Sequence, residues 1–329
     1  MPELSVVVPV FNEAEVLPET LRRLKAAVAA CAPDHEILYV DDGSHDESPT
    51  ILLAAATQDP RVRVLRFSRN FGHQAAVTAG IEHARGDAIV VIDADLQDPP
   101  EVIADLVAQW RAGYEVVSAV RTVREGESPV RLFLIRLFYR VMQRISSIDL
   151  TPDVGDFRLI DRKVADALNR LPERNRYVRG LIRWLGFRHC EVGYRRAGRF
   201  AGETKYPYTK LLRLALDGIT SFSTLPLKLV AYVGVAVSAL SLLLVLYALF
   251  GRFIEGRTPE GWTSVFVSLA FFSGVQLIAT GVLGMYLSRI FEEVKGRPVY
   301  VIAADTSAPS VHPPASPPAG GSAYVAEGA

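Results

Sequence analysis

Apolar and polar residues follow two alternating periods in the amino-terminal third of the chain. Short runs rich in Val and Ile predict strands at Leu4–Val10, Glu36–Val40, Val62–Phe67, Ala88–Ile92 and Glu115–Val120. The longer amphipathic stretches between them predict helices at Val16–Ala30, Ser48–Ala56, His73–Ala84 and Pro100–Arg111. Because these strands are apolar almost throughout, we expect an α/β domain whose mostly parallel sheet is covered on both faces.

The carboxy-terminal third has a different pattern. Residues 229–250 and 264–287 contain no charged side chain, and each run exceeds the roughly 20 apolar residues that cross a bilayer. The polar segment 251–263 between them predicts a turn, so the two runs form a transmembrane hairpin; the alternative is a pair of buried helices in a soluble protein. Basic residues lie on both flanks, which places both in the cytoplasm: Arg213, Lys228, Arg289, Lys295 and Arg297.

Two further segments carry basic and apolar residues at helical spacing. Residues 129–145 present Arg136, Arg140 and Arg144 beside Leu and Phe, which predicts a helix lying on a membrane surface. The alternative is a core helix with a solvated arginine face. Residues 206–228 repeat the pattern and predict an amphipathic juxtamembrane helix, so the cytoplasmic α/β domain would occupy residues 1–205.

The chain after the hairpin divides into two parts. Residues 289–302 predict a return segment on the cytoplasmic side. Residues 303–329 are rich in Pro, Ala, Ser and Gly, cannot build a core, and predict a disordered tail.

Composition narrows the class of protein. The 329 residues carry a formal net charge of zero, which argues against a nucleic-acid binder. Cys31 and Cys190 are too few for a disulfide framework and lack metal-ligand spacing. No basic region or small-residue cleavage site accompanies the first apolar run, so no signal peptide is expected. We therefore expect the amino-terminal part of the chain to stay in the cytoplasm.

Acidic side chains gather where the predicted parallel strands end. Glu13 follows the first strand, Asp41 and Asp42 the second, and Asp93 and Asp95 the fourth. Ligands of open α/β sheets bind outside the carboxyl ends of the strands, so these acids are expected to converge on one crevice. Carboxylates one residue apart at a strand end point roughly the same way, and such hard oxygens suit Mg²⁺ or Mn²⁺.

Several motifs together resemble the inverting glycosyltransferases of family 2, which have a GT-A fold. They are Val-Val-Pro-Val-Phe-Asn-Glu at 7–13, Asp-Asp-Gly-Ser at 41–44 and Asp-Ala-Asp-Leu-Gln-Asp-Pro-Pro at 93–100. With Gly-Asp-Phe-Arg-Leu at 155–159 and two terminal spans, the chain is similar to the polyprenyl-phosphate branch of that family over residues 4–300. That branch includes dolichyl-phosphate mannose synthases, bacterial prenyl-phosphate glucosyltransferases and aminoarabinose transferases.

The resemblance implies a nucleotide-diphospho-sugar transferase domain followed by a transmembrane hairpin. It implies a multi-pass protein of a bacterial cytoplasmic (inner) membrane, with its catalytic domain in the cytoplasm. It implies inverting, metal-dependent transfer of one sugar from a nucleotide sugar to an undecaprenyl-type polyprenyl phosphate at the cytoplasmic face of the membrane. UDP-glucose is the first expected donor, while GDP-mannose, UDP-N-acetylhexosamine and UDP-aminoarabinose fit the same frame.

The donor diphosphate accounts for the acidic residues. A divalent cation stabilises the leaving diphosphate as a Lewis acid. Asp95 and Gln97, alternate residues beyond the strand, are the metal candidates, and the resemblance places Asp93 in the metal or nucleotide shell and, with Asp95, among the catalytic residues. It implies a set of donor contacts: Pro9, Glu13, Asp42, Asp93 and Lys205. A plain strand-to-helix turn capped by Ser44 or Asp46 is the alternative for Asp42.

A prenyl monophosphate acceptor needs cations for its phosphate. Arg121 follows a predicted strand end beside the crevice and Arg131 lies on the amphipathic segment, and the forked guanidinium suits phosphate. Arg199 and Lys205 lie in a segment similar to the family's Arg-x-x-Gly-x-Ser-Lys, with Thr204 where Ser is usual. We assign Arg121, Arg131 and Arg199 to the acceptor phosphate, although Arg199 and Lys205 suit either phosphate group. Solvated surface cations are the alternative.

The resemblance makes Asp156 the candidate catalytic base. The second pKa of a phosphate monoester is about 6, so the acceptor oxygen is already largely ionised at neutral pH. Less base catalysis is needed than for a sugar hydroxyl. The alternative role for Asp156 is to orient the acceptor or a basic neighbour.

Two other functions remain to be weighed. A processive polysaccharide synthase of the same family is disfavoured because Gly180-Leu181-Ile182-Arg183-Trp184 lacks the glutamine of the Gln-x-x-Arg-Trp motif. A membrane scaffold without catalysis is disfavoured by the retained acids and arginines. Gly274, Gly281 and Gly284 permit close helix approach, and relatives suggest a tetramer, so a homo-oligomer is expected.

Overall fold

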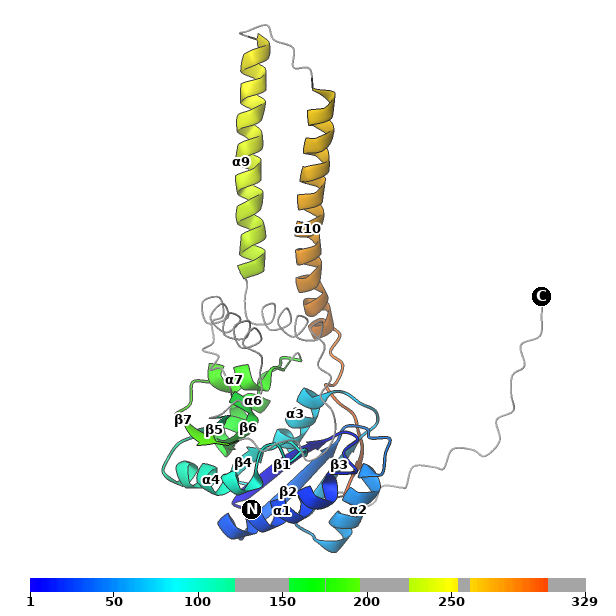
Figure 1. Ribbon diagram of the computed structural model, residues 1–329, viewed down its shortest axis with the longest axis vertical. Coiled ribbons are helices and arrows are strands. Elements are labelled where there is room, and N and C mark those ends of the chain that lie inside the picture. The colour runs from blue at the N-terminus through cyan, green and yellow to red at the C-terminus, as the bar shows by residue number, and fades with distance from the viewer. Residues whose placement is uncertain (122–153, 175, 196–224, 254–260, 307–329) are drawn as a thin grey trace, which may run out of the picture.

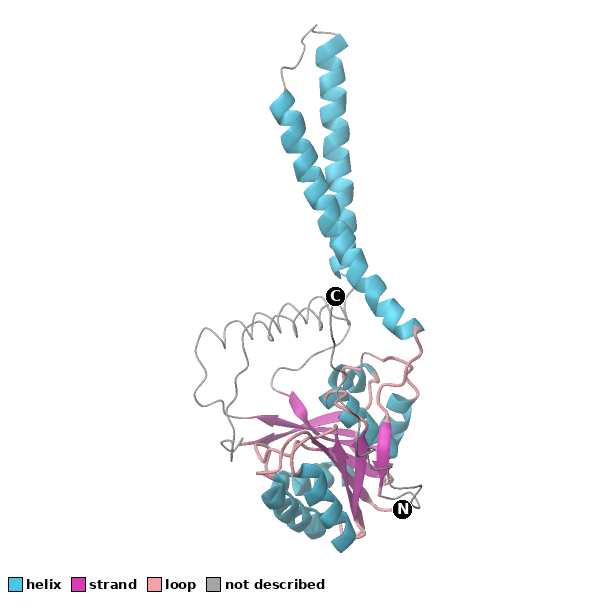
Figure 2. Cartoon of the chain, turned by 90° about the vertical axis from the view of Figure 1, so that its right-hand side faces the viewer, coloured by secondary structure: helices cyan, strands magenta, loops and turns pink. Residues whose placement is uncertain are grey.

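The computed structural model describes residues 1–121, 154–174, 176–195, 225–253 and 261–306. An α/β domain lies at one end, and two long helices project from it (Figure 1). The view turned by 90° shows the same two helices leaving the domain side by side (Figure 2). The predicted surface helix at 129–145, most of the juxtamembrane segment 206–228 and the tail from 307 onwards lie outside the described residues.

Within these residues, eight strands form one sheet in the order β7-β5-β6-β4-β1-β2-β3-β8. Their bounds are β1 Leu4–Val10, β2 His35–Asp41, β3 Val62–Phe67, β4 Ala88–Val91, β5 Val116–Arg121, β6 Val154–Asp161, β7 His189–Tyr194 and β8 Ile302–Asp305. β1 pairs in parallel with β2 and β4, β2 with β3, and β5 with β7. β6 runs antiparallel between β4 and β5. The predicted α/β class with a mostly parallel sheet is confirmed.

Helices cover both faces of the sheet. Their bounds are α1 Leu17–Cys31, α2 Ser48–Gln58, α3 His73–His83, α4 Ile103–Arg111, α6 Arg162–Asn169 and α7 Val178–Trp184. Prolines occupy the first turns of α1 and α2, where a missing N–H costs no hydrogen bond. The predicted helix at Pro100–Arg111 is divided into a short 3₁₀ turn, Pro100–Val102, and α4.

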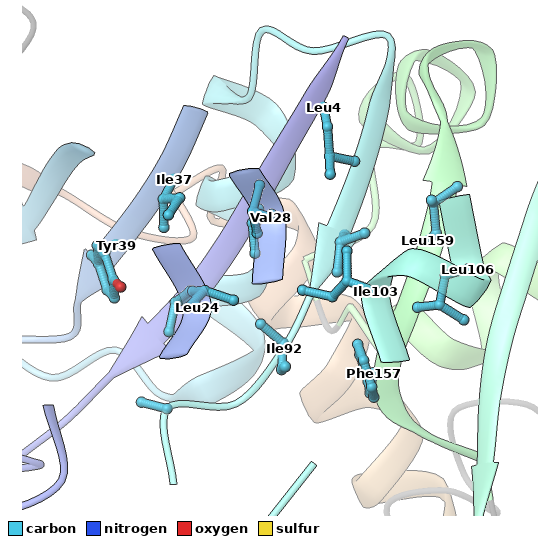
Figure 3. Close-up of a cluster of buried hydrophobic side chains, with 14 of the residues drawn as sticks. Leu4, Leu24, Val28, Ile37, Tyr39, Ile92, Ile103, Leu106, Phe157 and Leu159 are labelled. Atoms are coloured by element: carbon cyan, nitrogen blue, oxygen red, sulfur yellow. The ribbon is translucent and has the colours of Figure 1, made fainter. Parts of the chain in front are cut away.

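Side chains alternate across the strands and so divide the core into two clusters. Figure 3 shows the cluster between the sheet and helices α1 and α4, which includes Leu4, Leu24, Val28, Ile37, Tyr39, Ile92, Ile103, Leu106, Phe157 and Leu159. The opposite cluster joins the sheet to α3, α6 and α7. There α3 packs closely on β1, since a β-carbon at Gly80 would lie 2.0 Å from Cγ1 of Val7. This close approach fixes the start of α3 beside the carboxyl ends of the strands.

The two long helices are α9, Leu225–Phe253, and α10, Trp262–Val294. They contain the two uncharged runs of the sequence. Among the described residues, Phe271–Val294 is long and apolar enough to cross a membrane, and Leu227–Leu240 is a shorter apolar stretch. α10 continues to Val294, so the first part of the predicted return segment at 289–302 is helical.

The chain after α10 returns to the sheet. β8 pairs antiparallel with β3, and the backbone N–H of Thr306 donates to the carbonyl of Val64 at 3.1 Å. Tyr300 stacks on Phe67 with ring centroids 5.1 Å apart, and its hydroxyl donates to Glu82 at 2.7 Å. The prediction that the disordered tail begins at residue 303 is therefore wrong, because backbone pairing with β3 orders residues 303–306 despite their small side chains.

A buried charge network joins the amino-terminal ends of the central strands. Glu36 accepts hydrogen bonds from Ser5 Oγ at 2.6 Å, Arg63 Nη1 at 2.8 Å and the backbone N–H of Arg85 at 2.6 Å. Burial raises the pKa of Glu36, but these hydrogen bonds outweigh it and leave the pKa below its usual range. The network lies at the opposite edge of the sheet from the acidic strand ends, so it stabilises the domain away from them.

We expect Glu36→Gln to destabilise the domain by about 3 kcal/mol, because it leaves the Arg63 charge buried without a carboxylate. Since the pKa of Glu36 is lowered on folding, its stabilisation is present above the unfolded pKa of about 4.3 and is lost as the pH falls below that value. The measurement is the Tm of both proteins between neutral pH and about pH 3.5. The difference in Tm between the wild type and Glu36→Gln should narrow as the pH falls. A constant difference, or an equal effect of Glu19→Gln in the exposed Glu19–Arg22 pair, would contradict this account.

Candidate active site

The loops after β1 and β2 bind each other at the carboxyl edge of the sheet. The backbone N–H groups of Asn12 and Glu13 donate to Ser44 Oγ and Ser48 Oγ, both at 3.0 Å. Asn12 has a positive φ of 54°, and its Oδ1 accepts a hydrogen bond from the backbone N–H of His45 at 2.9 Å. Glu13 is thus held half-buried at this edge, where sequence analysis placed it.

Pro9 occupies a different place from the one expected. It lies within β1 in register with Val40 and is buried, so it is part of the strand. The apolar run of β1 includes Pro9 and continues to Val10. Its predicted contact with the nucleotide sugar stays a prediction.

Asp42 holds the loop that leads into α3. Its two carboxylate oxygens accept the backbone N–H groups of Phe71 at 2.6 Å and Gly72 at 2.9 Å. Burial, together with neighbouring Asp41, outweighs these bonds and raises the pKa of Asp42. Gly43 has a φ of +69°, and a β-carbon there would lie 2.5 Å from the backbone of Arg69. The turn after β2 therefore touches the loop after β3, which brings the first residue of α3 to the site.

The acids after β4 lie in a tight turn. Asp95 Oδ1 accepts the N–H of Gln97 at 3.1 Å, and Leu96 between them has a positive φ of 55°. Thr20 Oγ1 donates to the carbonyl of Ala94 at 2.7 Å and fixes the turn to α1. Asp93 and Asp95 are partly exposed, whereas Gln97 is buried.

The electrostatics of Asp93 show a local excess of negative charge. Burial raises its pKa to about 6; His73 opposes the rise, and the nearby carboxylates of Asp156, Asp95 and Asp98 add to it. Among the described residues, no group of three or more His, Cys, Asp or Glu side chains is arranged to hold a metal ion by itself. Mg²⁺ is often bound by one or two carboxylates with substrate phosphates and water completing the shell. The oxygen donors of Asp93 and Asp95 fit such a cation.

Asp156 forms the most tightly bound ion pair at this edge. Arg179 Nε and Nη2 donate to its two oxygens, each at 2.6 Å, and His73 Nε2 donates to Oδ2 at 3.1 Å. Burial opposes ionisation, but Arg179 and His73 hold the pKa of Asp156 far below its usual range. His73 Nε2 also lies 3.7 Å from Asp93 Oδ1, so one imidazole connects the acids of β4 and β6.

Burial lowers the pKa of His73, but the hydrogen bond to Asp156 and the charges of Asp93 and Asp156 raise it more, so the net shift is upward. His73 and Arg179 were not among the predicted site residues. His73 opens a helix directly after a strand-end loop, which is a usable signal. Arg179 lies far from the acidic motifs in sequence, and only the fold brings it to Asp156.

Arg121 is the last residue of β5 rather than a residue beyond it, and it lies close to the carboxylate of Asp98. Its Nε donates to the hydroxyl of Tyr194 at 3.2 Å, and its Nη2 lies 3.7 Å from Asp98 Oδ1. Tyr194 also donates to Asp98. Asp98 therefore joins β5 and β7 to the turn after β4. The other predicted cations, Arg131, Arg199 and Lys205, lie outside the described residues.

Comparison with known proteins identifies the class. Residues 5–168 match the profile of glycosyl transferase family 2. The chain is 48% identical over 300 residues to the uncharacterized glycosyltransferase YkcC of Bacillus subtilis (strain 168), with 91% of this chain and 93% of that protein covered. It is 42% identical over 300 residues to the bactoprenol glucosyl transferase of Shigella phage SfII, with 91% and 97% covered. A prophage bactoprenol glucosyl transferase homolog of Escherichia coli (strain K12) is 41% identical, with 91% and 98% covered.

The protein is thus a glycosyltransferase. More narrowly, the chain belongs to glycosyl transferase family 2, which confirms the family and the enzyme class predicted from the motifs.

We expect Asp42→Asn to loosen the 68–73 loop, because an amide offers only one oxygen to the two N–H donors of Phe71 and Gly72. Hydrogen exchange of peptides covering this loop should accelerate, and turnover should fall about 10-fold as His73 loses its place. Asp46→Asn is the matched control, since Asp46 accepts the N–H groups of Ala14 and Ser48 instead. Unchanged exchange at Phe71 and Gly72 in Asp42→Asn would show that Asp42 does not hold the loop.

Proposed function

We propose that this glycosyltransferase moves one sugar from a nucleotide sugar to a polyprenyl phosphate at the cytoplasmic face of a bacterial membrane, with inversion at the anomeric carbon. One observation carries the proposal: a sheet edge bearing Asp93, Asp95 and Asp156 is joined to two long apolar helices in one chain. A bactoprenol glucosyl transferase and a homolog of one each match over 300 residues, which is 91% of this chain.

The surfaces of α9 and α10 support a lipid environment. Large apolar side chains along them are exposed in the isolated chain, for example Leu277 at 73% and Ile278 at 70%. Soluble monomers rarely expose apolar patches of this extent. A bilayer would cover them, and the Lys and Arg residues on both flanks favour a cytoplasmic position for the catalytic domain.

The acids after β4 suit the donor. Asp93 and Asp95 would hold Mg²⁺ or Mn²⁺ together with the donor diphosphate, with Gln97 as the third candidate. When bound, the cation neutralises charge that develops on the leaving diphosphate. Glu13 and Asp42 lie at the same edge, where they support the predicted nucleoside contacts, and Lys205 is retained as a donor contact.

The acceptor needs little activation. An oxygen of the prenyl phosphate attacks the anomeric carbon, a new C–O bond forms, and the bond to the nucleoside diphosphate breaks with its electron pair on the leaving oxygen. The attacking oxygen is largely ionised at neutral pH because the second pKa of a phosphate monoester is about 6. Arg121, Arg131 and Arg199 remain the proposed cations for this phosphate.

UDP-glucose is the proposed donor, since the relatives that name a sugar name glucose. We retain the homo-oligomer, a tetramer in the first instance, as part of the proposal. The test is a donor panel: purified protein, undecaprenyl phosphate, Mg²⁺ or Mn²⁺, and one of UDP-glucose, UDP-N-acetylhexosamine, UDP-aminoarabinose or GDP-mannose, followed by mass spectrometry of the lipids.

We expect one dominant product, undecaprenyl phosphate carrying a single hexose from UDP-glucose. A different single sugar would keep the reaction and replace the donor. A ladder of oligomers would indicate a processive synthase, and the absence of lipid-linked sugar with every donor would contradict the reaction.

Removal of the cation should abolish this turnover. We expect excess EDTA to stop product formation and Mg²⁺ or Mn²⁺ to restore it, and Asp95→Asn to lower kcat by about 100-fold through lost stabilisation of the leaving diphosphate. Asp105→Asn, on the exposed face of α4, is the control and should retain normal turnover. Full activity in EDTA would exclude the cation.

A further inference from the structure

Arg179 and Asp156 form an ion pair at the carboxyl edge of the sheet, in which the acid is buried and the guanidinium is partly exposed. Asp156, on β6, is only 5% exposed at its side chain, while the Arg179 side chain above it, on α7, is 34% exposed. Both carboxylate oxygens face the Nε and Nη2 side of the guanidinium. Asp156 therefore fixes the orientation of the Arg179 guanidinium, which reaches the solvent near the acids that follow β4.

A second guanidinium lies close enough to this pair to interact with the charge of Asp156. Arg158, also on β6, is 3% exposed and donates to the carbonyl of Gly155 at 2.6 Å. Burial lowers its pKa to about 10, which still leaves it charged at neutral pH. The charge of Asp156 thus acts on two guanidinium groups at once. A buried guanidinium close to a partly exposed one favours an anionic ligand beside the exposed group.

We propose that Arg179 binds the phosphate of the acceptor and that Asp156 is a positioning residue, which aims the guanidinium of Arg179. The inference rests on the proposed function and deepens it, because it adds a phosphate-binding residue that sequence analysis did not identify. Arginine suits this task since its fork binds phosphate in a fixed geometry.

The ion pair of Arg179 favours the acceptor over the donor. Arg179 pairs with Asp156, whereas the cation of the donor diphosphate is proposed at Asp93 and Asp95; His73 Nε2 lies 3.7 Å from Asp93 and 3.1 Å from Asp156. Inversion requires the attacking oxygen and the leaving diphosphate to lie on opposite sides of the anomeric carbon. We therefore assign Arg179, which is held by a different acid, to the attacking phosphate.

The same contacts argue against Asp156 as a proton acceptor. Each of its oxygens already accepts a hydrogen bond from Arg179, and one accepts a second from His73. The ionised acceptor phosphate has no proton that must be removed at neutral pH. A carboxylate in this environment contributes by holding its neighbours.

The first test compares Arg179→Gln and Arg179→Lys with the wild type in detergent, by steady-state kinetics with undecaprenyl phosphate and UDP-glucose varied separately. We expect Arg179→Gln to raise KM for the lipid about 30-fold, while KM for the donor changes less than about 3-fold. Arg179→Lys retains the positive charge but not the forked guanidinium, so its KM for the lipid should lie between those of the wild type and Arg179→Gln. Arg183→Gln is the matched control: it lies on the same helix, pairs with Glu191 at 3.3 Å and should leave both KM values unchanged.

A double-mutant cycle tests the role of Asp156. If Asp156 acts through Arg179, Asp156→Asn should raise KM for the lipid, and Asp156→Asn combined with Arg179→Gln should be little worse than Arg179→Gln alone. The double variant also removes both members of the ion pair, so it stays informative if Arg179→Gln fails to fold. Independent, multiplicative losses in kcat, with lipid KM unchanged, would assign Asp156 a separate catalytic role.

The outcomes separate this inference from the proposed function. An active wild type whose lipid KM is unchanged in Arg179→Gln and Arg179→Lys, or whose donor KM rises instead, overturns the assignment of Arg179 alone. A wild type that forms no lipid-linked sugar with any donor of the panel overturns the proposed function and this inference with it.

Discussion

The sheet collects acidic side chains at its carboxyl edge, and their mutual repulsion is the constraint that the rest of the site satisfies. Each buried acid there has a partner from another element. Asp42 takes two backbone N–H groups of the loop before α3, Asp98 takes the hydroxyl of Tyr194, and Asp156 takes Arg179 and His73. Because every such contact joins segments distant in sequence, neutralising the acids also fixes the geometry of the site.

Asp93 is the exception within this arrangement. It is more exposed than Asp156, and its pKa is raised to about 6, whereas that of Asp156 is strongly lowered. Burial raises the pKa of Asp93 and nearby carboxylates add to the rise, whereas at Asp156 the hydrogen bonds from Arg179 and His73 outweigh burial. Ionisation of Asp93 and Asp95 together would be favoured by a cation, which we propose for this place.

Much of the fold is readable from the sequence because its central strands are buried on both faces. β1 and β3 match their predicted bounds, and β2, β4 and β5 differ by a residue at one or both ends. β6 was not predicted because Asp156 and Arg158, which build the site, stand between its apolar residues. The segment is therefore less apolar than the central strands. β8 was not predicted because Ala303 and Ala304 carry little pattern, and its order comes from backbone pairing. The acids of the site followed from strand ends, whereas His73 and Arg179 depend on tertiary contacts that no local pattern contains.

The helix pair is fastened to the catalytic domain at the end of α10. Glu293 accepts the backbone N–H of Arg174 at 3.0 Å, in the segment that leads to α7. In the segment after α10, the carbonyl of Val301 accepts the backbone N–H of Ser68 at 3.0 Å, next to the loop held by Asp42. The end of α10 therefore borders two segments that lead to Arg179 and His73.

The return of the chain as β8 also determines what remains if the long helices are removed. β3 would otherwise be an edge strand, with unpaired N–H and C=O groups along an apolar run. Such edges are templates for pairing with other chains and for aggregation. A fragment that stops before α9 lacks β8 and therefore leaves β3 as an unpaired edge strand. The residues after α10 thus protect the solubility of a domain whose sheet begins some 300 residues earlier.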